Sequence, residues 1–362
     1  MKNLMKNINL ENYIEECCQK TSNSQNKLEF TLHEPILTVI IPAYNMEHYI
    51  TRCIESIEKQ NEIDIEIIIV NDGSTDKTRN VVEKLSKNYE NIRIIDQTNI
   101  GLYHARANGV GYAKGKYITF VDADDTIVED FYLSAVKIID RSGADILEFG
   151  IRKVRGEEVL YEFSPPPNSY NGKEAIRRIL EKNGTSCSNC NKIYNRSLFT
   201  NILFFEDIRC YEEDKLINVK VMCKADRVEV IPDIGYIYDT REGSITTGKI
   251  SKEYLEMLKT SSIIYRYLKA HCPDLSDIAG RDYCAHLAYS YINLFLMDLD
   301  KEDEKRIRGQ IRETFINIYR EERLNRYKSK NDSFKRYVMI NSFRISPWLP
   351  ESIYRMYSMV GH

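Results

Sequence analysis

Short apolar runs mark the first third of the chain. The runs at 37–41 (LTVII), 65–70 (IEIIIV) and 117–121 (YITFV) are rich in β-branched residues and apolar at consecutive positions, which is typical of parallel strands buried on both faces. Helical patterns separate them at about 47–59, 77–88 and 102–113. This alternation predicts an α/β fold with an open, mostly parallel sheet flanked by helices, in which ligands bind beyond the carboxyl ends of the strands.

The pattern divides the chain into three regions. Residues 1–33 are polar and rich in Asn, Lys and Glu, and they are expected to be an N-terminal extension. Residues 34–249 carry the α/β pattern and form the predicted main domain. Residues 250–362 are helical almost throughout, with apolar residues at helical spacing such as Ile307, Ile311 and Phe315. We therefore expect a helical C-terminal region packed on the main domain.

Composition and charge restrict the compartment and the partners. Lys and Arg total 51 against 54 Asp and Glu, so the net charge of −3 gives no overall basic field for nucleic acid. The nine cysteines include the adjacent pair Cys17 and Cys18, which argues against a secreted disulfide framework. The N-terminus lacks the continuous apolar stretch of a signal peptide, and no apolar run approaches the ~20 residues that span a bilayer. We predict a cytoplasmic protein.

A polar cluster follows each predicted strand: PAYN at 42–45, NDGSTD at 71–76 and DADD at 122–125. Because these strands are expected to be parallel neighbours, the three clusters should converge at one edge of the sheet. Asp72 offers a carboxylate acceptor for a base N–H, and Tyr44 offers an aromatic face on which a base can stack. Ordinary turn chemistry is the alternative interpretation of both motifs.

The DADD cluster indicates a cation site. Three carboxylates within four residues repel one another unless a cation is present, and carboxylate oxygens suit Mg²⁺ or Mn²⁺. Such an ion normally completes its shell with ligand phosphates. The alternative is that these acids cap a helix that starts near Glu129. Arg106, on the helix before the third of these strands, can reach a phosphate or form a surface salt bridge.

Five motifs in register carry a family resemblance. LTVIIPAYN, IIIVNDGSTD, NIGLYHARANG, YITFVDADD and YEEDKLINVKV, between Leu37 and Thr247, resemble in order and spacing the family 2 glycosyltransferases with a GT-A fold. The resemblance implies an inverting hexosyl or N-acetylhexosaminyl transferase that moves a sugar from a nucleotide diphosphate, commonly UDP, to a hydroxyl. It also suggests a part in building a bacterial surface polysaccharide, with a glycan or a polyprenyl-linked acceptor.

The resemblance assigns roles to residues that share the strand ends and the loops beside them. It implies a nucleoside pocket lined by Pro42, Ala43, Tyr44 and Glu47, with Asp72 on the uracil edge. It implies a nucleotide and sugar border made of Asn99, Gly101, Arg106, Asp122 and Ala123, with Asp124 on a metal that bridges the two phosphates. Arg241, in TREGSIT, would be a second phosphate contact, and Asn191 and Lys192 would approach the acceptor.

Inversion in one displacement requires a base for the acceptor hydroxyl. The family pattern is an acidic pair before an apolar helix, and it matches Glu213 and Asp214, of which Asp214 is the predicted general base. The alternative is that these acids only stabilise the start of the helix. The glycine that usually precedes the pair is Glu212 here, a departure from the family pattern that leaves the geometry of the turn open but not the two carboxylates.

The role of the C-terminal tail and the choice between competing functions each leave alternatives open. The tail from 326 to 362 mixes basic and aromatic residues, and it is either a solvated basic face over packed helices or a peripheral contact with the inner face of the membrane. The competing functions are sugar-nucleotide synthesis by a nucleotidyltransferase, whose glycine-rich loop is missing from PAYNMEHY, and noncatalytic binding of a sugar nucleotide. The sequence does not specify an oligomeric state.

Overall fold

The computed structural model describes residues 34–240 apart from Leu203, Phe205 and Cys210, residues 255–324 apart from Asp298, and residues 334–348. The predictions for residues 1–33, for Arg241 and for most of the basic tail lie outside these ranges. From Pro35 onward the chain forms one compact unit, so the α/β part and the C-terminal helices pack together.

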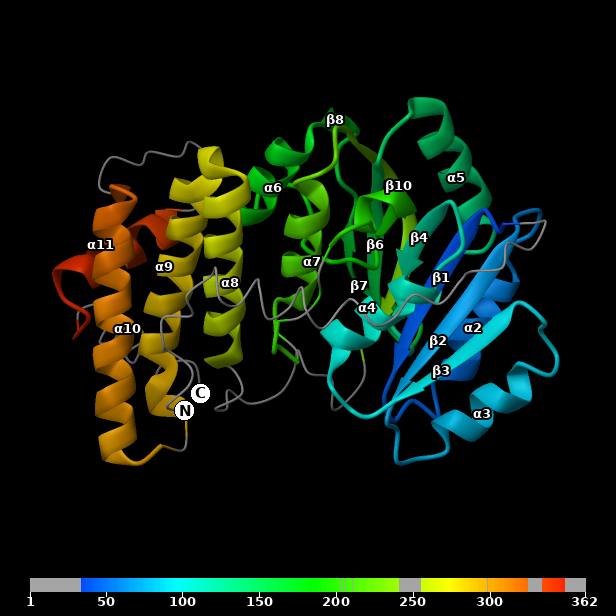
Figure 1. Cartoon of the computed structure of the whole chain (residues 1–362), viewed down its shortest axis with the longest axis horizontal. Helices are drawn as coiled ribbons and strands as arrows, with labels where there is room; N and C mark the ends of the chain where they lie inside the picture. Colours follow the sequence, from blue (N-terminus) through cyan, green and yellow to red (C-terminus); the bar gives the residue numbers. More distant parts are fainter. Residues whose placement is uncertain are drawn as a thin grey trace. The chain divides into compact units, whose positions relative to one another are not determined.

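Within the described residues, ten strands form one mixed sheet in the order β3-β2-β1-β4-β9-β6-β10-β5, with β7 beside β6 and β8 beside β10 (Figure 1). Its first half contains β1 (Leu37–Ala43), β2 (Ile65–Asp72), β3 (Ile92–Gln97) and β4 (Tyr117–Phe120). These four strands are parallel, and β1, β2 and β4 are the three runs that the apolar pattern predicts. The predicted α/β fold is confirmed.

The second half of the sheet mixes strand directions. It contains β5 (Thr126–Ile127), β6 (Ile146–Arg155), β7 (Glu158–Phe163), β8 (Asn168–Tyr170), β9 (Lys192–Asn195) and β10 (Val228–Asp239). β9 lies antiparallel between β4 and β6, while β6 and β10 are parallel. Because β9 reverses direction, the sheet as a whole is less parallel than the sequence pattern suggests.

Helices connect the strands and cover the sheet. They are α2 (Ile50–Glu58), α3 (Thr78–Leu85), α4 (Leu102–Tyr112), α5 (Phe131–Ser142), α6 (Gly172–Glu181) and α7 (Glu213–Met222), with the short 3-10 turn η2 (Arg196–Phe199). α4 packs on β1 and β2. Gly109 allows this close approach, since a Cβ at that position would lie 2.4 Å from Cγ2 of Ile40. Helix α4 therefore lies directly on the strands whose ends carry the predicted site.

The C-terminal region is helical, as predicted. It contains α8 (Glu256–His271), η5 (Pro273–Leu275), α9 (Ser276–Asn293), η6 (Leu294–Leu296), α10 (Lys301–Glu321) and α11 (Phe334–Ile345). α8, α10 and α11 all pack on α9, and the predicted apolar face of α10 is buried, with the Phe315 and Phe343 ring centroids 4.8 Å apart. α8 packs on α7 and α9 packs on α6, so this region contacts the α/β part directly (Figure 1).

Two observations bear on the membrane hypothesis. Among the described helices, we find none that combines the length and the apolar character needed to cross a bilayer. Arg336, one of the basic residues of the tail, is nearly buried and donates to Leu180 O at 2.6 Å and to Asp282 Oδ1 at 2.7 Å. Arg336 is therefore a packing residue rather than part of a solvated basic face, whereas Trp348 is 69% exposed.

Candidate active site

The loops that follow β1 and β2 are bonded to each other. The Asn45 amide donates to Ser74 Oγ at 3.1 Å, and Asn45 Oδ1 accepts from the Thr75 amide at 2.8 Å. Glu47 accepts from the Lys77 amide at 3.0 Å. The first two polar clusters of the sequence therefore converge, as the parallel register of β1 and β2 requires.

Tyr44 presents an exposed face beside this junction. Its side chain is 44% exposed, whereas those of Pro42 and Ala43, just before it, are buried. An exposed ring at the carboxyl edge of a sheet can stack on a nucleobase. Of these three residues, Tyr44 is the one whose side chain is accessible for the predicted nucleoside contact.

Asp72 organises the loop that leads into α4. Its carboxylate accepts from Gln97 Nε2 at 2.7 Å, from the Ile100 amide at 2.9 Å and from the Gly101 amide at 3.0 Å. The residue is 4% exposed. Asp72 thus fixes the predicted border residues Asn99 and Gly101 against the end of β2, and any base contact must use a carboxylate oxygen that already accepts hydrogen bonds.

Gly101 permits a close contact with the segment before α7. Its backbone φ of 98° lies in a region that residues with a side chain rarely adopt, and a Cβ at this position would lie 2.7 Å from Cα of Arg209. Arg209 in turn donates to the carbonyl oxygen of Asn99 at 2.7 Å. Arg209 is a cation beside the predicted nucleotide border that the sequence patterns do not single out.

The DADD segment separates into side chains with different environments. Asp125 is 1% exposed and accepts from the Tyr236 hydroxyl at 2.6 Å and from the Asp239 amide at 2.9 Å. Burial and the negative charges of Asp122 and Asp124 raise the pKa of Asp125 well above its ordinary value. Asp125 therefore anchors the segment to β10, while Asp122 and Asp124 are only half-buried.

Asp124 can serve as the expected metal ligand only if a bound diphosphate supplies further oxygen atoms to the ion. Within the described part of the chain, no group of three His, Cys, Asp or Glu side chains is arranged to hold a metal ion. A single carboxylate that shares an ion with the oxygens of a diphosphate is nevertheless the arrangement that Mg²⁺ favours. The backbone of Asp124 is fixed through its carbonyl oxygen, which accepts from Arg52 at 2.7 Å.

Arg106 is the centre of the site. Its side chain is 1% exposed, and its Nη2 donates to Asp122 Oδ1 at 2.8 Å. Its Nη1 donates to Glu213 Oε1 at 3.1 Å and to Asp214 Oδ1 at 2.5 Å. Both terminal nitrogens of Arg106 are therefore engaged by carboxylates, so in this conformation the residue joins the two acid clusters rather than extending towards a phosphate.

The acidic pair occupies the first turn of α7. The side chain of Asp214 is 24% exposed, and its Oδ1 also accepts from Asn189 Nδ2 at 3.0 Å. Oδ2 accepts from the Asn189 amide at 3.3 Å. Asn189 is fully buried, between Tyr194 and Asn218, and it is a positioning residue that the sequence patterns do not identify.

Glu213 lies deeper than Asp214. Burial, together with the neighbouring Asp214 carboxylate, raises the pKa of Glu213 to about 7, and the positive charge of Arg106 limits the rise. Glu213 is thus partly protonated near neutral pH, and of the pair, Asp214 is the more exposed carboxylate.

The turn before α7 differs from a glycine turn in sequence but not in conformation. Glu212 has φ 62° and ψ 17°, which is the left-handed conformation that glycine adopts most easily. Tyr211 before it also has a positive φ, of 66°. The turn that the sequence leaves open is therefore left-handed at Glu212, a conformation that the chain adopts here without glycine.

The residues expected to approach the acceptor are buried. Asn191 and Lys192 are both 0% exposed. Asn191 donates to Phe149 O at 2.7 Å, and Lys192 Nζ donates to Ser186 O and Ser188 O, at 2.8 Å each. Both side chains hold the 186–191 segment in place and neither is exposed in this conformation, so their approach to an acceptor stays a prediction.

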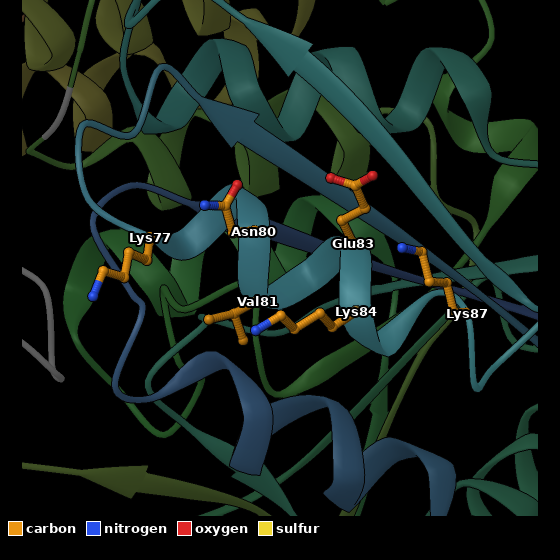
Figure 2. Close-up of a pocket in the computed structure, with 6 residues that line it drawn as sticks. All are labelled: Lys77, Asn80, Val81, Glu83, Lys84 and Lys87. Atoms are coloured by element: carbon orange, nitrogen blue, oxygen red, sulfur yellow. The ribbon is translucent and has the colours of Figure 1, made fainter.

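A surface hollow of about 300 Å³ lies elsewhere, along α3. Figure 2 shows the side chains that line it, which are those of Lys77, Asn80, Val81, Glu83, Lys84 and Lys87. None of the predicted site residues is among them. The candidate site at the carboxyl edge of the sheet is therefore distinct from this hollow.

The chain is similar in sequence to known glycosyltransferases. Residues 38–203 match the glycosyl transferase family 2 domain. The chain is 33% identical over 220 residues to the uncharacterized glycosyltransferase EpsJ of Bacillus subtilis. The aligned region covers 59% of this chain and 63% of EpsJ. The chain is also 27% identical over 275 residues to TarS of Staphylococcus aureus, a poly(ribitol-phosphate) β-N-acetylglucosaminyltransferase, covering 74% of this chain and 47% of TarS. The chain spans less than two thirds of the length of either relative.

The fold is also similar to a solved structure. The crystal structure of residues 1–349 of S. aureus TarS in complex with UDP-GlcNAc superposes with a TM-score of 0.63 and 25% identity, over 78% of this chain and 81% of that one. The fold is that of a GT-A type glycosyltransferase domain. The sequence match and the fold support the family 2 glycosyltransferase that the sequence motifs predict.

Proposed function

We propose that this protein transfers a sugar from a UDP-sugar to an acceptor hydroxyl with inversion at the anomeric carbon, using Asp214 as the general base. The observation that carries the proposal is the joint binding of Asp122 and Asp214 by the buried guanidinium of Arg106. This arrangement brings Asp122, which is expected beside the donor, next to Asp214, which is expected beside the acceptor. A transferase requires both at one point.

A UDP-sugar is the donor that the site and the relatives support. Tyr44 offers an exposed ring at the end of β1, and Asp72 fixes the loop at the end of β2. The solved TarS structure holds UDP-GlcNAc in the same fold. We therefore propose a UDP-linked hexose or N-acetylhexosamine, bound with its base at the β1 and β2 ends and its diphosphate near the DADD segment.

Asp214 is oriented to take the acceptor proton. Its Oδ1 accepts from Arg106 and from Asn189, so the carboxylate is fixed, while Oδ2 accepts one longer hydrogen bond, of 3.3 Å. In the proposed step Oδ2 accepts the proton of the acceptor hydroxyl as its oxygen bonds to the anomeric carbon. The bond from that carbon to the diphosphate oxygen breaks, and UDP leaves with the electron pair.

Asp124 is the proposed ligand of a divalent cation, Mn²⁺ or Mg²⁺. Such an ion would neutralise the charge that develops on the leaving diphosphate. The chain's own part is to hold the Asp124 backbone through Arg52 and to anchor the segment through Asp125. The buried Asp125 fixes the position of the half-buried Asp124 beside it.

The acceptor is proposed from the relatives. TarS is named for poly(ribitol-phosphate), and another relative, 36% identical over 185 residues, is a teichoic acid poly(glycerol phosphate) polymerase of Staphylococcus epidermidis. Both names refer to polyol-phosphate polymers. We therefore propose a hydroxyl of a bacterial surface polymer as the acceptor, reached from the exposed side of Asp214.

The test is a donor screen on the purified chain. Released UDP is measured for several UDP-sugars with Mn²⁺, Mg²⁺ or EDTA, with and without glycerol phosphate or ribitol phosphate oligomers. We expect metal-dependent release that Asp214→Asn abolishes while UDP binding persists, and that Asp274→Asn, at an exposed site far along the chain, leaves unchanged. UDP-sugar binding without release by the wild type would support the noncatalytic alternative.

A further inference from the structure

A buried ionic cluster joins the start of α7 to the C-terminal helices. Lys215 Nζ donates to Glu212 Oε1 at 2.6 Å and to Asp282 Oδ2 at 3.0 Å. Asp282, on α9, also accepts from Arg336 of α11 at 2.7 Å. The side chains of Lys215 and Asp282 are only 6% and 4% exposed. Four charged residues from three helices and the turn before α7 thus meet, with the more exposed side chains of Glu212 and Arg336 only 19% and 11% exposed.

Two polar side chains of the C-terminal helices complete the cluster. Ser261 Oγ, on α8, lies 3.0 Å from Glu212 Oε2 and 2.8 Å from His286 Nδ1. His286 Nε2, on α9, lies 3.2 Å from Glu212 Oε1. We call these residues the Lys215 cluster: Glu212, Lys215, Ser261, Asp282, His286 and Arg336. The Glu212 carboxylate therefore has contacts with α7, α8 and α9.

The charges of the Lys215 cluster are balanced. The nearby cations keep the pKa of Asp282 well below its ordinary value despite burial, and Asp282 and Glu212 raise the pKa of Lys215. Burial, followed by the charge of Lys215, lowers the pKa of His286, which favours its neutral form. Two carboxylates thus face two cations. Removing one partner would leave an unpaired buried charge, which is costly.

The Lys215 cluster contacts the carboxylate of Glu212, a residue with a strained backbone conformation. Glu212 has φ 62°, a conformation that costs a non-glycine residue free energy and persists only when its surroundings enforce it. The surroundings here are the contacts of its carboxylate with Lys215, Ser261 and His286. Glu213 and Asp214 follow directly in the chain, so the conformation of Glu212 sets the direction in which both acids project.

We propose that the C-terminal helices position the catalytic acids through the Lys215 cluster, with Lys215, Ser261 and Asp282 as positioning residues that hold Glu212 in its left-handed conformation. This inference rests on the proposed function of Asp214. It gives the helical region a role in catalysis beyond covering the apolar surface of the α/β part. None of the three residues touches the reacting atoms.

The kinetic test uses variants of graded severity with a matched control. Lys215→Met removes the central cation, Ser261→Ala removes one hydroxyl, and Lys215→Arg keeps the charge. Asp274→Asn removes the charge of Asp274 from the exposed Lys173–Asp274 pair, 2.8 Å long, which also connects the α/β part to the helical region but belongs neither to the Lys215 cluster nor to the acidic pair. We expect Lys215→Met to lower kcat about 10- to 100-fold with little change in KM for the UDP-sugar. Lys215→Arg should recover part of that loss, and Asp274→Asn should match the wild type.

A rescue experiment separates positioning from general stability. Glycine adopts the left-handed conformation without strain, so Glu212→Gly removes the need for side-chain support. We expect the effect of Lys215→Met on kcat to shrink to less than about threefold in the Glu212→Gly background, since the two changes are coupled. Equal losses from Lys215→Met in both backgrounds would overturn the proposal.

An activity-independent measurement keeps the inference testable if a variant or the wild type releases no UDP. Hydrogen exchange is followed for peptides that cover residues 211–217 in the wild type, Ser261→Ala and Asp274→Asn. We expect faster exchange of this turn in Ser261→Ala and unchanged exchange in Asp274→Asn. A wild type without UDP release would reject the proposed function alone, whereas unchanged exchange at 211–217 in Ser261→Ala would reject the positioning role.

Discussion

Nη1 of Arg106 lies 2.5 Å from Oδ1 of Asp214, although the two residues are 108 positions apart in the chain. The same guanidinium holds Asp122 at 2.8 Å. A loop at the end of β4 and the first turn of α7 are thus tied to one side chain of α4. Since Asp122 and Asp214 belong to the two halves of the proposed reaction, their spacing depends on Arg106.

We expect Arg106→Met to destabilise the protein and to impair transfer together. The substitution leaves Asp122, Glu213 and Asp214 without their shared cation, which should cost about 3–5 kcal/mol of unfolding free energy. Urea denaturation measures that loss. Arg106→Lys should retain more stability but still lower kcat, because one ammonium group cannot reproduce the planar fork.

The matched control is Arg79→Met. Arg79 pairs with Asp96 at 2.9 Å, and its side chain is 38% exposed. An exposed pair of this kind contributes less than about 1 kcal/mol, and kcat should not change. Equal losses of stability in the Arg106 and Arg79 variants would contradict the central role of Arg106.

Asn189→Ala should lower kcat more than it lowers donor affinity. The change removes the Nδ2 donor that holds Asp214 at 3.0 Å, so the carboxylate can rotate away from the acceptor. Steady-state kinetics with a fixed acceptor and varied UDP-sugar distinguish the two effects. The control is Asn293→Ala. Asn293 is also fully buried but lies on α9, so its loss should reduce stability and leave kcat unchanged. A rise in KM without a change in kcat for Asn189→Ala would speak against the positioning of Asp214.

The pKa of Glu213 gives a pH-dependent prediction. Because this pKa is about 7 in the folded protein and 4.5 is its ordinary value, the folded state binds more protons than the unfolded state between these values. Glu213 therefore makes the wild type less stable as pH rises from about 4.5 to about 7. Glu213→Gln lacks this term, so its stability relative to the wild type should increase by about 2–3 kcal/mol over that window. Parallel pH profiles of unfolding free energy would refute the shift.

Gly101→Ala should disturb the nucleotide border without touching the acids. The new methyl group would lie 2.7 Å from Cα of Arg209, at a backbone φ of 98°. We expect a loss of stability of about 1–3 kcal/mol and weaker UDP binding, measured by calorimetry. Gly111→Ala is the control, since a Cβ there has nothing within 4 Å. Unchanged UDP affinity in Gly101→Ala would separate this loop from the donor site.

The sequence predicts the elements that local pattern determines. The runs that become β1, β2 and β4 are continuous and apolar because both faces of these parallel strands are buried. The clusters that follow them converge because parallel neighbours end at one edge, which places Asn45 beside Ser74. The acidic pair at 213–214 begins a helix, as its position before an apolar stretch indicates.

Contacts between residues far apart in the chain cannot be predicted from the local sequence pattern. Nothing local shows that Arg106 meets three carboxylates rather than solvent, because its partners come from the loop after β4 and from α7. Asn191 and Lys192 have the composition of a surface segment, yet β9 pairs on both sides and buries them. The conformation of Glu212 depends on α8 and α9, more than forty residues later in the chain. Burial and pairing of this kind follow from tertiary structure alone.

The central claim is that the acid clusters joined by Arg106 form one site for a UDP-sugar and a divalent cation. The most direct measurement is a crystal structure of the chain with UDP and Mn²⁺, with the ion located by its anomalous scattering. The account predicts an ion about 2 Å from a carboxylate oxygen of Asp124 that also contacts the diphosphate, with the base beside Tyr44. UDP bound away from the carboxyl edge of the sheet, or an ion far from Asp124, would contradict it.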